Sequence, residues 1–124
     1  MDKKIIFTQK ANLPIGPYSQ AVFANGFLFI SGQIAGEKVG IGSVEDETNL
    51  VLENLKQILL ASEMDFSHVV KSSIFLKDLN DFVKVNEVYG SFFKENPPAR
   101  ETFEVSKLPK DARVEISCIA FKSL

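Results

Sequence analysis

Two charged side chains in the last quarter of the chain are the best candidates for chemistry. Arg100 follows a Pro-Pro-Ala run, at the start of a predicted strand. Its planar, permanently charged guanidinium suits bidentate capture of a carboxylate. Glu115 lies in a later strand and points away from the face that carries Val114 and Ile116. A surface salt bridge at Arg100 and a solvated Glu115 are simpler alternatives, so the residues alone indicate only a small-anion site.

Other polar residues occur where strands and helices usually place apolar ones. Tyr18 lies in a run of turn-forming residues, and Ser31 and Gly32 end an apolar strand. Glycine at a strand end lets a ligand or another backbone segment approach closely. Asn86 interrupts the apolar face of a predicted helix. Each has a structural alternative: a packed tyrosine in a turn, a strand terminus, and an asparagine at the core boundary.

Several common kinds of site find no support in the sequence. His68 is the only histidine and Cys118 the only cysteine, so no cluster with zinc spacing exists. We interpret His68 as a surface loop residue and Cys118 as a small core residue. The glycines at 36, 40 and 42 lack the strand before and the helix directly after that a phosphate-binding loop requires. We therefore set aside a zinc site and a phosphate-binding loop.

Hydrophobic periodicity and turn signals predict the elements that position these residues. Asn25-Gly26 between two apolar runs is typical of a hairpin turn. A helix is expected over about residues 44–62, because Ser43 and Asp46 resemble a capping box. A strand is expected over residues 69–76.

A second helix is expected from a cap at Asp78 or Asn80 to about Phe93, where a Pro-Pro pair ends the segment. Two further strands are expected near residues 100–105 and 113–121. The predicted order is β-β-β-α-β-α-β-β. Two helices of this kind would cover one face of a mixed sheet, which is an α+β fold.

Size and composition restrict the class of protein. The 124 residues predict a single domain over 1–124, and 45% hydrophobic with 24% charged residues is typical of a globular chain. The net charge is −2 and no basic stripe is visible, which argues against nucleic-acid binding. No apolar run is long enough for a membrane span or a signal peptide, so we expect a cytoplasmic protein.

The size and the aromatic content predict two further features. A domain this small has little interior, so if the chain is an enzyme, its substrate cleft is expected between subunits. Tryptophan is absent and phenylalanine occurs 11 times, so we expect phenylalanine to fill much of the core.

Taken together, these segments resemble the reactive imine deaminase family, called RidA or YjgF. The matching motifs include Ile-Gly-Pro-Tyr-Ser-Gln-Ala at 15–21, Ile-Ser-Gly-Gln-Ile at 30–34, Pro-Ala-Arg at 98–100 and Val-Glu-Ile at 114–116. The remaining matches are residues 54–55, 69–71, 75–82, 85–89 and 108–109. The resemblance covers nearly the whole chain in order and spacing.

The resemblance implies a chorismate-mutase-like (ferredoxin-like) fold assembled as a homotrimer, with a central barrel-like core and a cleft at each subunit interface. The implied activity is hydrolysis of 2-imino acids, such as 2-iminobutanoate and 2-iminopropanoate, to 2-oxo acids and ammonia. These imines arise from enamines that PLP-dependent dehydratases release. No metal or organic cofactor is needed.

The resemblance also implies roles for individual residues. Arg100 would hold the substrate carboxylate, assisted by the backbone N–H of Thr102. Glu115 would deprotonate the attacking water and return a proton to the departing nitrogen. The residues expected to shape the cleft and complete its contacts are Tyr18, Ser31, Gly32 and Asn86.

Three positions depart from the family pattern. Thr102 stands where bacterial members often have cysteine, which puts thiol-dependent behaviour there in doubt. Glu63 stands where the family commonly has glycine after its first long helix, so that helix end is expected to differ locally. Ser117 replaces the second glutamate of the closing strand, whereas the carboxylate of Glu115 is retained.

Two alternatives to an imine deaminase remain open. A small regulatory module that binds 2-oxo acids would use the same arginine without strong catalysis. An endoribonuclease or translation inhibitor is a third class, also attributed to family members. The acidic balance and the lack of a histidine pair argue against the third class.

Overall fold

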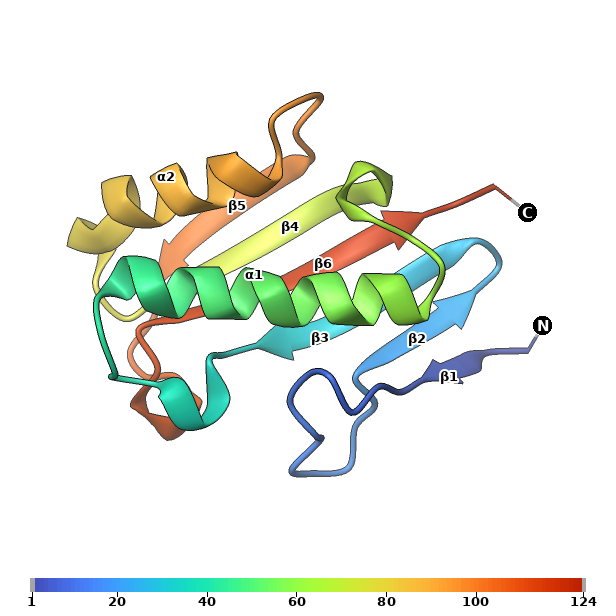
Figure 1. Ribbon diagram of the computed structural model, residues 1–124, viewed down its shortest axis with the longest axis horizontal. Coiled ribbons are helices and arrows are strands. Elements are labelled where there is room, and N and C mark those ends of the chain that lie inside the picture. The colour runs from blue at the N-terminus through green and yellow to red at the C-terminus, as the bar shows by residue number, and fades with distance from the viewer. Residues whose placement is uncertain (1, 124) are drawn as a thin grey trace.

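The computed structural model describes residues 2–123, which form one six-stranded sheet with helices on one face (Figure 1). The strands are β1 (Lys4–Ile6), β2 (Ala21–Ala24), β3 (Phe27–Gln33), β4 (Val69–Leu76), β5 (Ala99–Glu104) and β6 (Val114–Phe121). Their order across the sheet is β1-β2-β3-β6-β4-β5. Among the described strands β4 and β5 are parallel, and every other neighbouring pair is antiparallel. The predicted mixed sheet and the predicted element order are confirmed.

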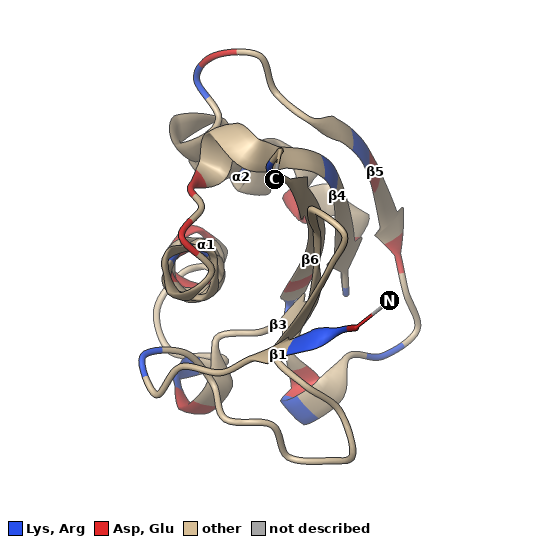
Figure 2. Ribbon diagram, turned by 90° about the vertical axis from the view of Figure 1, so that its right-hand side faces the viewer, with Lys and Arg blue, Asp and Glu red and all other residues tan. Residues whose placement is uncertain are grey.

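Both helices pack against the same face of the sheet, as the edge-on view shows (Figure 2). α1 (Val44–Ala61) begins with the predicted capping box, in which Ser43 and Asp46 bond reciprocally. α2 (Phe82–Phe92) connects the parallel pair β4 and β5. Single 3₁₀ turns are η1 (Gly36–Lys38), η2 (Phe66–His68), η3 (Leu79–Asp81) and η4 (Pro109–Asp111). None of the helices in the described part of the chain is long and apolar enough to cross a membrane.

The structure defines the start of α2 and the end of α1, the two helix ends that the sequence did not fix. Asp78 caps η3 by accepting a hydrogen bond from the backbone N–H of Asn80, and α2 begins only at Phe82. Glu63, which follows α1, adopts the left-handed conformation with φ of 58°. The ammonium of Lys122 donates to the Glu63 carbonyl at 2.8 Å. This helix end therefore has the backbone conformation that glycine favours, although the residue is glutamate.

The core between sheet and helices is aliphatic, which corrects the expectation that phenylalanine fills it. Leu28, Leu52, Leu55, Ile58 and Leu59 are fully buried, and Phe93 is the one phenylalanine among the buried residues of the described chain. The predicted burial of Cys118 is confirmed, because only 3% of its surface is exposed. The phenylalanines lie elsewhere because of strand alternation, which turns several of them to the opposite face.

The face of the sheet away from the helices is uncovered and apolar. Its large exposed side chains are Ile5, Phe27, Phe29, Phe103 and Phe121, with Phe75 and Ile119 partly buried among them. Phe29 is 48% exposed and Phe103 54% exposed, although both lie within strands. Figure 2 shows this open face on the side of the sheet opposite α1. An apolar sheet face of this extent is typical of a surface that another protein chain covers.

Candidate functional site

An irregularity in β3 brings the N-terminal turn to the middle of the sheet. The register between β3 and β6 shifts between Ile30 and Gln33, so Ser31 and Gly32 form a bulge. The Ser31 hydroxyl donates to the Ser19 carbonyl at 2.6 Å, and the Ser31 N–H donates to the Gln20 carbonyl at 2.9 Å. These bonds attach the turn that carries Tyr18 to the bulge.

The buried amide of Gln20 sets the shape of that turn. Its Nε2 donates to the carbonyls of Thr8 and Asn12, and its Oε1 accepts from the Thr8 N–H. Tyr18 lies 49% exposed at the rim of a pocket of about 450 Å³. Gly32 and Lys110 also line this pocket. Gln20 therefore holds one wall of the pocket, a role that its place in a turn motif did not reveal.

Glu115 occupies the space in front of Gly32. A Cβ atom on Gly32 would lie 2.4 Å from Oε2 of Glu115 and 2.8 Å from its carboxyl carbon. The group that approaches this glycine within the chain is therefore the Glu115 carboxyl, rather than a backbone segment. Burial raises the pKa of Glu115. A raised pKa makes a carboxyl group a stronger base than an ordinary glutamate, which favours taking a proton from water and later returning it.

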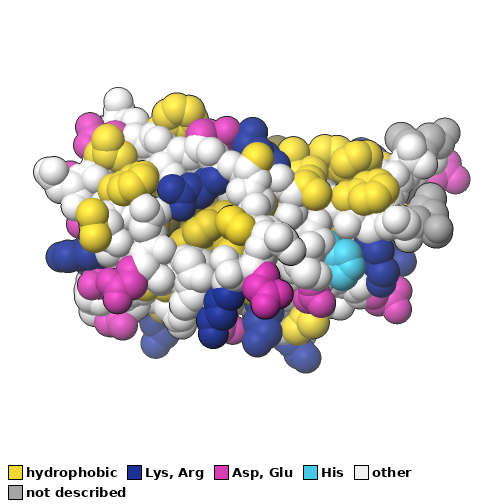
Figure 3. Space-filling view, turned by 90° about the horizontal axis from the view of Figure 1, so that it is seen from above, with side chains coloured by type: hydrophobic (Ala, Val, Ile, Leu, Met, Phe, Trp, Pro, Cys, Tyr) yellow, Lys and Arg dark blue, Asp and Glu magenta, His cyan; other side chains and the backbone are white. Residues whose placement is uncertain are grey.

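The remaining predicted site residues meet at the other edge of the sheet. Arg100 lies on β5, and its Nη1 donates to Oδ1 of Asn86 on α2 at 2.7 Å. Thr102 lies two residues further along the same strand. Figure 3 looks onto the edge formed by α2 and β5, where basic side chains lie among hydrophobic ones. The structure thus brings Asn86 and Arg100 together.

The two groups of residues do not meet within one chain. Arg100 pairs with Ser72 on the helix-covered face, whereas Glu115 pairs with Phe75 on the open face. The Cα atoms of Arg100 and Glu115 lie roughly 14 Å apart, because two strand spacings across the sheet and three residues along the strand lie between them. A single chain therefore presents two half-sites. We define the bulge half-site as Tyr18, Ser31, Gly32 and Glu115, and the arginine half-site as Asn86, Arg100 and Thr102.

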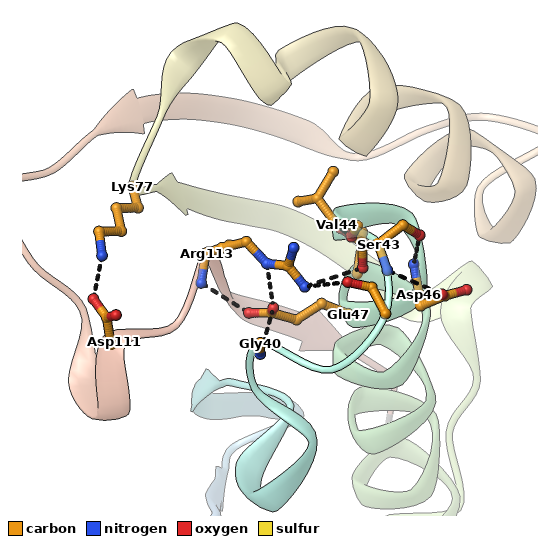
Figure 4. Close-up of polar contacts among 10 residues, drawn as sticks. Gly40, Ser43, Val44, Asp46, Glu47, Lys77, Asp111 and Arg113 are labelled. Carbon is orange, nitrogen blue, oxygen red and sulfur yellow. Dashed lines mark hydrogen bonds and ion pairs between the residues drawn. The ribbon is translucent and has the colours of Figure 1, made fainter.

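An ion pair that the sequence analysis missed fixes the start of β6 (Figure 4). Oε1 of Glu47 accepts from Nε of Arg113 at 2.7 Å, and Oε2 accepts from the Arg113 backbone N–H at 2.8 Å. The N–H of Gly40 also donates to Glu47, which is fully buried. This carboxylate joins α1, the loop after η1 and the segment two residues before Glu115. The available signal was an acidic residue on the buried face of α1.

The two residues set aside from the sequence have structural roles. His68 lies in η2, where its Nδ1 accepts a hydrogen bond from the Asp65 N–H at 3.0 Å. Burial raises the pKa of the Cys118 thiol to about 11, so it is protonated at neutral pH. Among residues 2–123 no group of three or more His, Cys, Asp or Glu side chains could hold a metal ion.

Comparisons with known proteins agree with this fold and with these motifs. A sequence profile for the family described as Endoribonuclease L-PSP matches residues 8–122. A RutC family protein of Pyrococcus horikoshii is 52% identical over 97% of this chain and 98% of its own length. The human 2-iminobutanoate/2-iminopropanoate deaminase is 44% identical over 97% of this chain and 90% of its own length.

A solved structure extends the likeness to three dimensions. Escherichia coli TdcF, crystallised with bound serine, is 40% identical and superposes with a TM-score of 0.91, covering 97% of this chain and 99% of its own. The profile match spans most of the chain, and the relatives align over nearly their full lengths. The chain therefore belongs to the Endoribonuclease L-PSP family, which includes the RidA/YjgF reactive intermediate deaminases.

Proposed function

We propose that this protein hydrolyses 2-imino acids such as 2-iminobutanoate and 2-iminopropanoate. In this reaction water adds to the C=N carbon, and the C–N bond then breaks to give a 2-oxo acid and ammonia. The observation that carries the proposal is the chemistry of the two half-sites. One contains a guanidinium held by an amide oxygen, and the other contains a half-buried carboxyl group of raised pKa.

Each half-site matches one requirement of the substrate. The guanidinium of Arg100 binds the fixed negative charge, the carboxylate next to the imine carbon. Glu115 takes one proton from the attacking water and delivers one to the nitrogen before it leaves as ammonia. Imines also hydrolyse without an enzyme, so anchoring plus one acid–base group of about 10²–10⁴-fold effect is sufficient.

The proposal requires a second copy of the chain. Arg100 and Glu115 lie on opposite faces of the sheet, so the complete site is formed when the arginine half-site of one subunit meets the bulge half-site of its neighbour. The open face supplies an apolar surface for that contact, with Phe29 and Phe103 about half exposed in the single chain. A cyclic homotrimer with three clefts, placed in the cytoplasm, is the assembly that we propose.

Two relatives support the substrate class. The human relative is named as a 2-iminobutanoate/2-iminopropanoate deaminase. The TdcF crystal structure holds serine, an α-amino acid with the same carboxylate position as a 2-imino acid. In this chain we propose that Arg100 binds the equivalent carboxylate.

The direct test couples the protein to a threonine or serine dehydratase and follows disappearance of the imine. The wild-type chain should accelerate 2-oxo acid formation, and Arg100→Ala should abolish the acceleration without changing the assembly. Glu115→Gln should lower kcat by about 10²–10⁴-fold while pyruvate still binds. An unchanged rate in Arg100→Ala would refute the assigned mechanism.

A mixing experiment tests the shared site. Arg100→Ala and Glu115→Gln chains are unfolded together, refolded and assayed beside each variant refolded alone. In randomly assembled cyclic trimers about one quarter of the interfaces would combine an intact arginine with an intact glutamate. Recovery of about one quarter of the wild-type activity in the mixture supports a site between subunits. Absence of recovery, with mixed trimers verified by mass, would show that each site lies within one chain.

Two other functions of the family are separated by the same variants. A regulatory module for 2-oxo acids predicts tight pyruvate binding with no imine hydrolysis by the wild type. An endoribonuclease predicts RNA cleavage that elutes with the trimer and is lost in Arg100→Ala. The family's descriptive name favours RNA cleavage, whereas the net charge of −2 disfavours a polyanionic substrate such as RNA.

A further inference from the structure

The guanidinium of Arg100 rests on one face of α2. Phe82, Asn86 and Tyr89 are four and three residues apart, so they lie on the same side of this helix. The guanidinium carbon lies 5.1 Å from the centroid of the Tyr89 ring and 5.6 Å from that of Phe82. With the Asn86 bond, one helical stripe supplies an acceptor and two aromatic rings to the same cation.

The Tyr89 ring is itself held rigidly. It is only 4% exposed and stacks on Phe93, with the ring centroids 4.5 Å apart. Phe93 in turn makes an edge contact with Phe66 in η2 at 5.0 Å. The ring under the guanidinium is therefore one end of a row of three packed aromatic rings, Tyr89, Phe93 and Phe66, and its neighbours restrict its movement.

We infer that Tyr89 is a positioning residue for Arg100 and that Phe82 is a second, more exposed support. The inference rests on the proposed function, because it concerns how the same guanidinium binds a substrate carboxylate. A free arginine side chain loses rotamer freedom when it captures an anion, and that loss weakens binding. The aromatic face and the Asn86 bond restrict Arg100 before the ligand arrives.

The arrangement also selects the direction from which the ligand binds. The guanidinium carbon lies over the Tyr89 ring at 5.1 Å, so no ligand can approach from that side, and Asn86 takes one of the five N–H donors. The remaining donors lie in the guanidinium plane. A planar carboxylate binds there through two parallel hydrogen bonds. A substrate carboxylate would thus be presented edge-on to the arginine.

The experiment compares Tyr89→Leu with Tyr89→Phe, which keeps the ring and removes only the hydroxyl. Pyruvate is the probe, measured as a competitive inhibitor of imine hydrolysis and by calorimetry. Tyr89→Leu should raise KM and weaken pyruvate binding by about 5- to 30-fold, with kcat nearly unchanged. Tyr89→Phe should restore both values. Methyl pyruvate, which lacks the carboxylate charge, should lose far less affinity than pyruvate.

Two further variants separate positioning from general damage. Phe92→Leu removes another aromatic ring from the same helix, one that packs on Phe66 rather than on Arg100, and it should leave KM unchanged. Phe82→Leu tests the inference at a half-buried position, in case Tyr89→Leu fails to fold. It should raise KM by several-fold.

The outcomes distinguish this inference from the proposed function. If Tyr89→Leu and Phe82→Leu bind pyruvate like the wild type while Arg100→Ala does not, the positioning role is refuted and the proposed site stands. If the wild type binds pyruvate but hydrolyses no imine, the proposed catalysis fails and the positioning role is judged on binding alone. A fall in kcat equal to the rise in KM would contradict a role confined to the carboxylate.

Discussion

Replacing Gly32 with alanine should disable Glu115 without unfolding the protein. The added Cβ would lie 2.4 Å from Oε2 of Glu115, about 1 Å inside ordinary van der Waals contact. The atoms that it meets belong to the end of a flexible side chain, so the carboxyl group can swing away. Gly32 does not have the positive φ that strains other residues, so alanine fits its backbone.

The magnitude follows from the size of that displacement. A shift of about 1 Å in a catalytic group can cost on the order of 10²-fold in rate, so we expect kcat to fall by about 10²-fold. The free energy of unfolding should change by less than about 1 kcal/mol, because only one side chain has to move. The assays are the dehydratase-coupled imine hydrolysis and urea unfolding at equal protein concentration.

A second glycine provides the matched control. A Cβ on Gly90, in α2, would meet no atom within 4 Å. Gly90→Ala should leave kcat unchanged and stabilise the helix by about 0.5–1 kcal/mol. The double variant Gly32→Ala/Glu115→Gln should be no slower than Glu115→Gln alone, because both changes act on one group. A full additional loss in the double variant, or wild-type activity in Gly32→Ala, would refute the reasoning.

Three further predictions concern stability. Glu47→Gln should lower the free energy of unfolding by about 2–4 kcal/mol, because one buried N–H loses its acceptor and Arg113 loses its charge partner; a change below about 0.5 kcal/mol in urea would contradict this. Glu63→Gly should raise the free energy of unfolding by about 1 kcal/mol, because a non-glycine residue is strained at the φ of 58° found there. A lowered melting temperature in this variant would contradict that strain. The raised pKa of Glu115 means that the folded chain binds its proton more tightly than the unfolded chain does. In the isolated chain, where no neighbour's guanidinium faces Glu115, its ionisation costs stability as the pH rises through the folded pKa. Glu115→Gln should therefore exceed the wild type in stability at pH 7 when both are compared as dissociated chains. That gap should close below about pH 4.5, the ordinary value, and a gap independent of pH would exclude this cause.

Local features were predictable because their causes are local. The hairpin turn at Asn25-Gly26, with φ of 51° and 89°, and the capping box at Ser43 each depend on a few adjacent residues. The strand over residues 69–76 was predicted to its exact bounds from its β-branched run. The start of α2 was not, because Asp78 can cap either a 3₁₀ turn or an α-helix, and tertiary packing decides between them.

The core and the site required contacts between distant segments. Alternation in the strands showed which residues share a face, but it could not show which face the helices cover. The phenylalanines of β3, β5 and β6 were consequently assigned to a core that leucine and isoleucine occupy. Glu47 and Arg113 are 66 residues apart, so nothing local connects them. The same holds for Gly32 and Glu115, which only the register of β3 against β6 brings together.

The separation of the two half-sites has a consequence for the acidity of Glu115. In the isolated chain no arginine of its own half-site faces this carboxyl, and burial keeps its pKa raised. In the proposed trimer a neighbour's guanidinium would lower that pKa, because opposite charges favour the ionised form. A bound carboxylate cancels the guanidinium charge, so ligand binding should raise the pKa again and make Glu115 a stronger base when substrate is present. A carbon-13 NMR titration of glutamate-labelled protein, with the resonance assigned by its loss in Glu115→Gln, measures this directly. The pKa should be higher with saturating pyruvate than without it. An unchanged or lower value would mean that the substrate carboxylate does not lie between the two groups.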